Sequence, residues 1–268
     1  MMKQNKRIAI LACIPAVLLL LSAMVCIIFV PQIRYSRYLK QKDYTEMIIV
    51  YENRLKSLWD FDQKIFLDLN DCTQAVYENY RAKTVEYQAA QREIESIAQT
   101  GYADPDIVQN TISHIQELND SRKKYTEAVS KDNAKSYVEA VALYKQVIAD
   151  DSDYETAQMR IANIPQEFRT YTEEAAQKEE ETENFAAANE FLQTYLDFKE
   201  DDELLQRLNR NTALIEAAAS AEKGDFAQAQ EILEAYNEDA IVSDKLKLYR
   251  EQAEQGTEAE TSESSSED

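Results

Sequence analysis

The chain opens with an unbroken apolar segment, and the hydrophobic residues that follow it recur at helical spacing. Residues 8–30, IAILACIPAVLLLLSAMVCIIFV, contain no charged side chain. As a helix rising 1.5 Å per residue this segment would be about 34 Å long, enough to cross a hydrocarbon core of about 30 Å. We therefore predict one N-terminal transmembrane helix over 8–30, preceded by a basic head at 1–7.

Two other interpretations of this segment are weaker. A cleaved signal peptide has a shorter apolar core, roughly 7–15 residues, followed by small residues at its cleavage site. No such site follows Val30. A lipid-anchored Cys26 is the other alternative, but Met24 and Val25 before it match poorly the small residues that lipoprotein processing favours. An uncleaved signal anchor is the prediction.

Basic residues lie on both sides of the anchor in similar numbers, so the positive-inside rule barely favours either orientation. A short basic head is what a signal anchor usually keeps in the cytoplasm, and a long body can cross regardless of nearby charge. We expect a single-pass membrane protein with its N-terminus cytoplasmic and its body extracytoplasmic, in a bacterial cell membrane. The basic residues are Lys3, Lys6 and Arg7 on one side and Arg34, Arg37, Lys40 and Lys42 on the other.

Residues 31–130 show apolar positions three and four apart, which predicts long helices. We expect one helix from Arg34 to about Lys56 and another from residue 59 or 60 to about Gln99, close to 60 Å long. Gly101 should end the second helix. Asp104 and Pro105 should start a third, running to about residue 130, because Asp caps helices and Pro favours their first position. The 60–99 and 105–130 helices should form an antiparallel hairpin.

Four short segments share one pattern of a polar residue, an aromatic residue and, three residues later, Met or Ala. They begin at Asp43, Ser136, Asn184 and Asp225. The polar residue can cap a helix, the aromatic can wedge against the preceding helix, and the small residue lets two backbones approach. The predicted packing positions are Tyr44, Tyr137, Ala140, Tyr144, Phe185, Ala188, Phe191, Phe226, Ala229 and Leu233.

This pattern resembles the second helix of a tetratricopeptide repeat, most clearly in SYVEAVALYKQVIADDSDYETA at 136–157. The aromatics at 137, 185 and 226 are spaced more widely than the 34-residue period of that family. The resemblance implies TPR-like helical hairpins over 131–250, stacked as an α-solenoid whose first helices line a concave groove. Pro165 should break or kink one of those first helices.

The amino-acid composition argues against most catalytic, metal-binding and cofactor-binding sites. The chain has one His, three Gly and three Cys. His114 alone builds no multi-histidine metal site, and three scattered glycines build no phosphate loop. Cys72 should be a packed side chain rather than a reactive thiol. We therefore expect no catalytic residues, no metal and no cofactor.

The charge is strongly acidic and unevenly placed. All 50 acids lie after residue 42, and the three bases of the head leave 26 of the 29 bases to oppose them. Such a body is repelled by nucleic acid and by anionic lipid headgroups, whereas basic or neutral partners remain possible. The Ser/Glu-rich tail at 251–268 should be disordered. A basic partner, or phosphorylation of its serines if it is cytoplasmic, are its alternative roles.

We expect an all-α, membrane-anchored helical-repeat protein that binds protein or peptide partners. We do not expect it to be an enzyme. The alternative is a structural spacer or self-assembling envelope or division factor, in which the long helices pair with each other or with a second copy. Three arginines of the expected groove-lining helices could contact acidic ligand groups, or could be ordinary surface charges: Arg160, Arg207 and Arg210.

Overall fold

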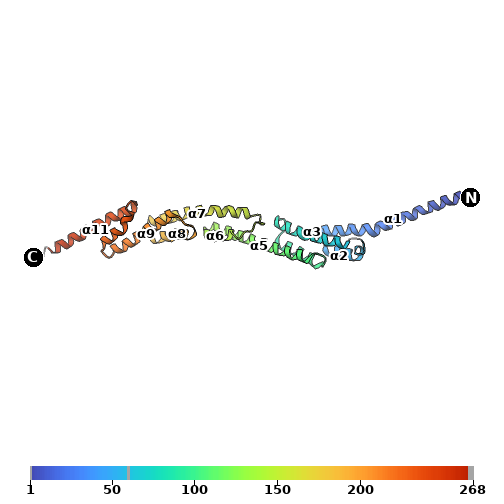
Figure 1. Ribbon diagram of the computed structural model, residues 1–268, viewed down its shortest axis with the longest axis horizontal. Coiled ribbons are helices and arrows are strands. Elements are labelled where there is room, and N and C mark those ends of the chain that lie inside the picture. The colour runs from blue at the N-terminus through green and yellow to red at the C-terminus, as the bar shows by residue number, and fades with distance from the viewer. Residues whose placement is uncertain (1, 59–60, 265–268) are drawn as a thin grey trace. The chain divides into compact units, whose positions relative to one another are not determined.

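The computed structural model describes residues 2–58 and 61–264, and every regular element in that part of the chain is a helix (Figure 1). In chain order they are α1 Met2–Gln41, α2 Tyr44–Val50, the π-helical η1 Tyr51–Leu55, α3 Phe61–Arg81, α4 Tyr87–Gln99, α5 Pro105–Asn133, α6 Tyr137–Tyr144, α7 Tyr154–Glu180, α8 Phe185–Phe198, α9 Asp202–Ala221, α10 Phe226–Leu233, the 3-10 helix η2 Glu234–Tyr236 and α11 Ala240–Ser264. The predicted all-α class is confirmed.

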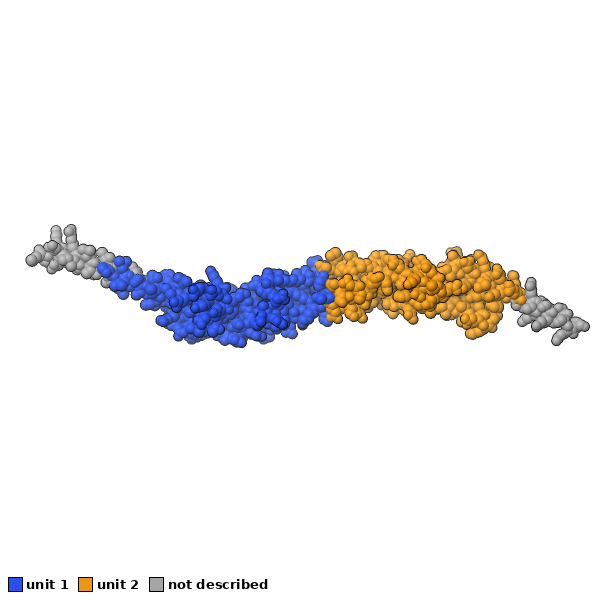
Figure 2. Space-filling view, turned by 180° about the vertical axis from the view of Figure 1, so that it is seen from behind, with its two compact units in different colours: residues 1–126, 146–155 blue, residues 127–145, 156–268 orange. Residues whose placement is uncertain are grey.

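Two compact units divide the chain (Figure 2). Unit 1 comprises residues 1–126 and 146–155, and unit 2 comprises residues 127–145 and 156–268. In unit 1, α1 packs against α2 and η1, and α3 packs against α4. In unit 2, α9 packs against both α8 and α10, and α10 packs against α11.

The apolar segment is helical, and almost all of its described side chains over 17–30 are exposed. Leu18 is 60% exposed, Leu20 is 70% exposed and Ile27 is 67% exposed, an unfavourable state for such side chains in water. α1 is long and apolar enough to cross a membrane. Its burial against the protein begins at Pro31, directly after the apolar segment, and Tyr35 is fully buried.

The prediction of one helix from Arg34 to Lys56 is wrong. α1 ends at Gln41, Lys42 takes a positive φ of 59°, and α2 begins at Tyr44. The Asp43 carboxylate accepts a hydrogen bond from the N–H of Glu46 at 3.1 Å, which caps the new helix.

The prediction of a forty-residue helix over 60–99 is also wrong, because α3 ends at Arg81 and α4 begins at Tyr87. Lys83 has a φ of 57° and reverses the chain. No Gly or Pro marks this turn. Tyr80 and Tyr87 on its two sides are seven residues apart, so the helical spacing continues through the turn and conceals it.

The predicted antiparallel hairpin between 60–99 and 105–130 is replaced by a different arrangement. Asn70 of α3 accepts a hydrogen bond from the N–H of Asp104 at the start of α5, and Tyr80 near the end of α3 bonds Asn119 further along α5. The contacts advance in the same direction along both helices, so α3 and α5 are parallel. The short helix α4 returns the chain between them.

Five helices end with the same turn, in which one residue adopts a left-handed conformation. The next N–H then bonds the carbonyl five residues earlier, as Asp43 bonds Tyr38 and Asn184 bonds Glu179. This is the Schellman arrangement that satisfies the last carbonyls of a helix. The left-handed residues are Lys42, Lys83, Lys135, Glu183 and Gly224.

The remaining expectations about helix ends have mixed outcomes. Gly101 follows the end of α4 with a φ of 71°, and the Asp104 carboxylate accepts the N–H of Asp106 at 2.9 Å, as predicted. Pro165 does not end α7, which runs continuously from Tyr154 to Glu180.

We predicted a disordered tail over 251–268. In the structure α11 continues to Ser264, so residues 251–264 are helical. The Glu, Ala and Gln residues of this segment favour a helix even without a core to pack against. Residues 265–268 of the predicted tail lie outside the described residues.

Candidate interaction surface of unit 2

The predicted packing positions lie mainly in the interior. Each small residue of the pattern is fully enclosed, because the helix it belongs to approaches a neighbour there. The buried positions, with their exposed fractions, are Tyr44 4%, Tyr137 8%, Ala140 0%, Tyr144 1%, Phe185 7%, Ala188 0%, Ala229 0% and Leu233 0%.

Two predicted positions are only half-buried, Phe191 and Phe226. The ring of Phe191 meets Tyr171 edge-on at 6.4 Å, and the ring of Phe226 lies 6.5 Å from Tyr249. Phe226 packs at the edge of the hydrophobic cluster that also contains Leu233. These two aromatic side chains therefore pack at the edges of the hydrophobic core rather than in its centre.

A buried ionic network joins α7 to α9. Glu180, at the end of α7, is 6% exposed and accepts two hydrogen bonds of 2.8 Å from the Arg207 guanidinium. It also accepts one from the Asn211 amide at 2.8 Å and pairs with Arg210 at 2.8 Å. Arg207, Arg210 and Asn211 are three and four residues apart, so α9 presents them on one face.

A similar contact joins α7 to the end of α5. Arg160 of α7 makes a bidentate contact with Asp132 near the end of α5, at 2.8 and 2.9 Å. Asp132 and Glu180 each lie three residues before a left-handed residue, Lys135 and Glu183 respectively. The same kind of arginine contact therefore fixes each long helix to the end of the previous one.

One further arginine, Arg169, and Arg210 of the same network each contact the start of the next long helix. Arg169 of α7 donates to Asp201 at 2.8 Å, and Asp201 also caps α9 by accepting the N–H of Leu204 at 3.1 Å. Arg210 donates to Asp239 at 2.8 Å, and Asp239 accepts the N–H of Ile241 at the start of α11. One carboxylate thus serves both as a helix cap and as an ion-pair partner.

These contacts hold the carboxylates in their charged form. Burial would raise the pKa of Glu180, but hydrogen bonds from Arg207 and Asn211 and the charge of Arg210 outweigh it and lower that pKa. Burial would also raise the pKa of Asp239, but the hydrogen bond and charge of Arg210 outweigh burial and lower that pKa. The hydrogen bond from Arg169 is the main cause of the lowered pKa of Asp201.

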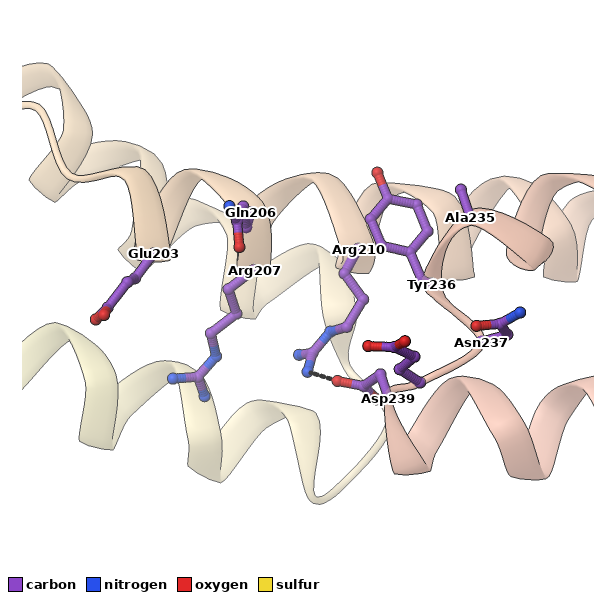
Figure 3. Close-up of a pocket in the computed structure, with 9 residues that line it drawn as sticks. Glu203, Gln206, Arg207, Arg210, Ala235, Tyr236, Asn237 and Asp239 are labelled. Atoms are coloured by element: carbon purple, nitrogen blue, oxygen red, sulfur yellow. Dashed lines mark hydrogen bonds and ion pairs between the residues drawn. The ribbon is translucent and has the colours of Figure 1, made fainter.

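A groove of about 700 Å³ opens beside this network, between α9 and the segment that leads into α11 (Figure 3). Figure 3 shows Arg207 and Arg210 extending from the same side of α9, with Arg210 bonded to Asp239. The groove combines two amides, one aromatic ring and acidic groups. Its lining is Glu203, Gln206, Arg207, Arg210, Ala235, Tyr236, Asn237, Glu238 and Asp239.

The arginines that the sequence offered as contacts for acidic ligands are occupied. Arg160, Arg207 and Arg210 each bond carboxylates of the protein itself. Sequence reasoning did not find Glu180, the partner of Arg207 and Arg210, or the fully buried Asn211. The sequence signal that could have found this contact is an acidic residue three positions before the left-handed residue at the end of each helix. Asp132 and Glu180 occupy these positions.

Other potentially reactive groups have ordinary surroundings. Burial raises the pKa of the Cys72 thiol even though a hydrogen bond with Tyr44 opposes the shift, which disfavours the reactive thiolate. His114 is exposed, and its ring lies 5.8 Å from Tyr77. Across the described residues, no group of three or more His, Cys, Asp or Glu side chains is arranged to hold a metal ion.

Comparison with protein-family models, with curated proteins and with solved structures finds no match.

Proposed function

We propose that this protein is a membrane-anchored helical-repeat interaction protein whose unit 2 groove binds an extended, basic segment of a partner protein. The bare apolar helix supports the anchor. The groove of about 700 Å³ is the observation that carries the binding proposal. Its arginines are neutralised by Glu180 and Asp239, and Glu203 pairs with Arg169. The exposed side chains left to meet a partner include Asn237 and Glu238.

The lining suits a peptide main chain and positive side chains. The amides of Gln206 and Asn237 can each donate to a peptide carbonyl and accept from a peptide N–H. Tyr236 offers an aromatic face to a Lys or Arg side chain. Glu238 forms no ion pair among the described side chains and can meet that positive charge directly. An acidic chain of net charge −21 also attracts basic partners at long range.

The repeated turns support a tetratricopeptide-like arrangement of unit 2. α7 and α9 are parallel, since Arg169 contacts Asp201 and the later residue Glu180 contacts the later residues Arg207 and Asn211. Parallel long helices separated by shorter returning helices are the design of helical-repeat stacks, whose long helices line a groove. In this proposal the ion pairs keep the groove rigid, which limits the entropy lost on binding.

A binding experiment with a matched control tests this function. The full chain in nanodiscs of zwitterionic lipid is titrated with a library of extended peptides that carry Lys and Arg, and a second library carries Glu instead. Basic peptides should bind, and Glu238→Lys should weaken them at least tenfold. Glu231→Lys makes the same charge change on α10 at an exposed residue outside the groove and should leave binding unchanged. Equal loss in both variants would show non-specific attraction and refute the groove.

Self-assembly is a second candidate, favoured by two exposed apolar residues on α3. Phe66 is 40% exposed and Leu67 is 50% exposed. We propose as the alternative function that a second copy covers them and the protein acts as a spacer. Analytical ultracentrifugation of the full chain in detergent should then show a dimer that Phe66→Ser with Leu67→Ser converts to a monomer. A native chain that is monomeric at every concentration rejects this candidate.

A further inference from the structure

The arginines of this protein fall into two groups. Seven of them form ion pairs with carboxylates: Arg81, Arg122, Arg160, Arg169, Arg207, Arg210 and Arg250. Among the other described arginine side chains, four form no ion pair and are exposed: Arg34, Arg37, Arg54 and Arg92. An exposed arginine without a carboxylate is unexpected in a chain with 50 acids and 29 bases.

Three of these four arginines, Arg34, Arg37 and Arg54, gather where the apolar segment ends, whereas Arg92 lies on α4. Arg34 and Arg54 line a groove of about 410 Å³ together with Ile27 and Val30, the last residues of that segment. Arg37 lines a neighbouring groove of about 490 Å³ with Phe29 and Lys40. Each groove therefore has an apolar wall on α1 and a cationic rim.

The position of the rim follows from the anchor. If residues 8–30 fill the hydrocarbon core, the next turns of α1 enter the polar headgroup layer, which is several ångströms thick on each side. Arg34 and Arg37 lie in those turns. η1 packs against α1 and brings Arg54 to the same level. The wall at Ile27 and Phe29 then faces acyl chains while the guanidinium groups face phosphates.

We propose that Arg34, Arg37, Lys40 and Arg54 form a juxtamembrane basic surface that binds the phosphate groups of anionic phospholipids in the leaflet beside unit 1. Guanidinium groups make bidentate contacts with phosphate, and basic residues next to a membrane segment are attracted to anionic lipid. Binding of this kind holds η1 and α2 against the bilayer and counters the repulsion of the acidic body from an anionic surface. The inference rests on the proposed anchoring.

The chain provides a matched control for this surface. A triple variant, Arg34→Gln with Arg37→Gln and Arg54→Gln, removes three positive charges at the juxtamembrane basic surface. A control triple variant removes three positive charges elsewhere, at the exposed residues Arg92, Lys178 and Lys199, again with Gln. Both variants therefore have the same net charge.

The experiment uses the full chain reconstituted in nanodiscs that contain phosphatidylcholine and phosphatidylglycerol in a 2:1 ratio. Native mass spectrometry of the released protein counts the lipids of each kind that remain bound. The native chain and the control should retain phosphatidylglycerol in preference to phosphatidylcholine. The juxtamembrane variant should lose that preference at least fivefold. Equal preference in the two variants, or no preference in the native chain, overturns the proposal.

Two further measurements keep the outcome unambiguous. Circular-dichroism melts test the fold, and if the triple variant melts early, the three single variants replace it; an unchanged preference in all three contradicts the proposal. Alkaline extraction of vesicles tests the anchor separately. A chain that is extracted refutes the anchoring on which both proposals depend, whereas a chain that stays embedded without lipid preference refutes only the juxtamembrane basic surface.

Discussion

Glu180→Gln should destabilise unit 2 strongly while unit 1 keeps its stability. The Glu180 carboxylate is 6% exposed, accepts hydrogen bonds from Arg207 and Asn211 and pairs with Arg210. Glutamine removes the negative charge and turns an NH₂ group toward guanidinium donors, which leaves Arg207 without a charged partner. Breaking a buried ion pair by removing one partner costs about 3–5 kcal/mol.

Hydrogen exchange of the full chain in detergent, read by mass spectrometry, measures this loss in each unit separately. Since about 1.4 kcal/mol corresponds to a factor of ten, protection in α8 and α9 should fall by roughly a hundredfold to a few thousandfold. Peptides from α3 and α4 in unit 1 should exchange as before. Glu174→Gln, at an exposed position of the same helix, should change protection by less than about 0.5 kcal/mol. An equally small effect at Glu180 would refute the reasoning that this network holds α7 to α9.

Three other perturbations have defined outcomes. Tyr144→Ala should cost about 3–5 kcal/mol in a thermal melt because the ring is 1% exposed, whereas half-buried Phe226→Ala should cost only about 1–2 kcal/mol; equal effects would contradict the burial. Gly224→Ala should cost about 1 kcal/mol of unfolding free energy, from its φ of 82° alone, since an added Cβ meets no atom within 4 Å; no loss in a melt would contradict the left-handed turn. Because the folded-state pKa values of Glu180 and Asp239 are lowered, their stabilisation is complete above about pH 5 and is lost as pH falls through the lowered values; acid titration of the unit 2 hydrogen exchange measures this, and a loss as pH rises would contradict it.

The sequence predicted features that depend on local chemistry. A helix starts at Pro105 after Asp104 because a capping carboxylate and a proline act within one turn. The apolar segment over 8–30 is recognised by its composition alone, and the packing role of Ala140 follows from its place after a cap and an aromatic. None of these features requires knowledge of distant parts of the chain.

The features that sequence reasoning missed depend on contacts between distant residues. The turn at Lys83 has no Gly or Pro, and α3 packs against α4 on its two sides. The parallel direction of α3 and α5 follows from that turn, so one missed residue also reversed the predicted pairing. Glu180 and Asn211 are 31 residues apart, and nothing in either neighbourhood indicates that they share a hydrogen bond.

The central claim is that an anchored helical-repeat body binds basic polypeptide segments in the α9 groove. The most direct test is to measure the dissociation constant of a selected basic peptide for the full chain in nanodiscs. That constant is compared between two charge-reversed variants. The account predicts that Glu238→Lys weakens binding at least tenfold and that Glu231→Lys leaves it unchanged. Unchanged binding in both, or the same loss in both, would contradict it.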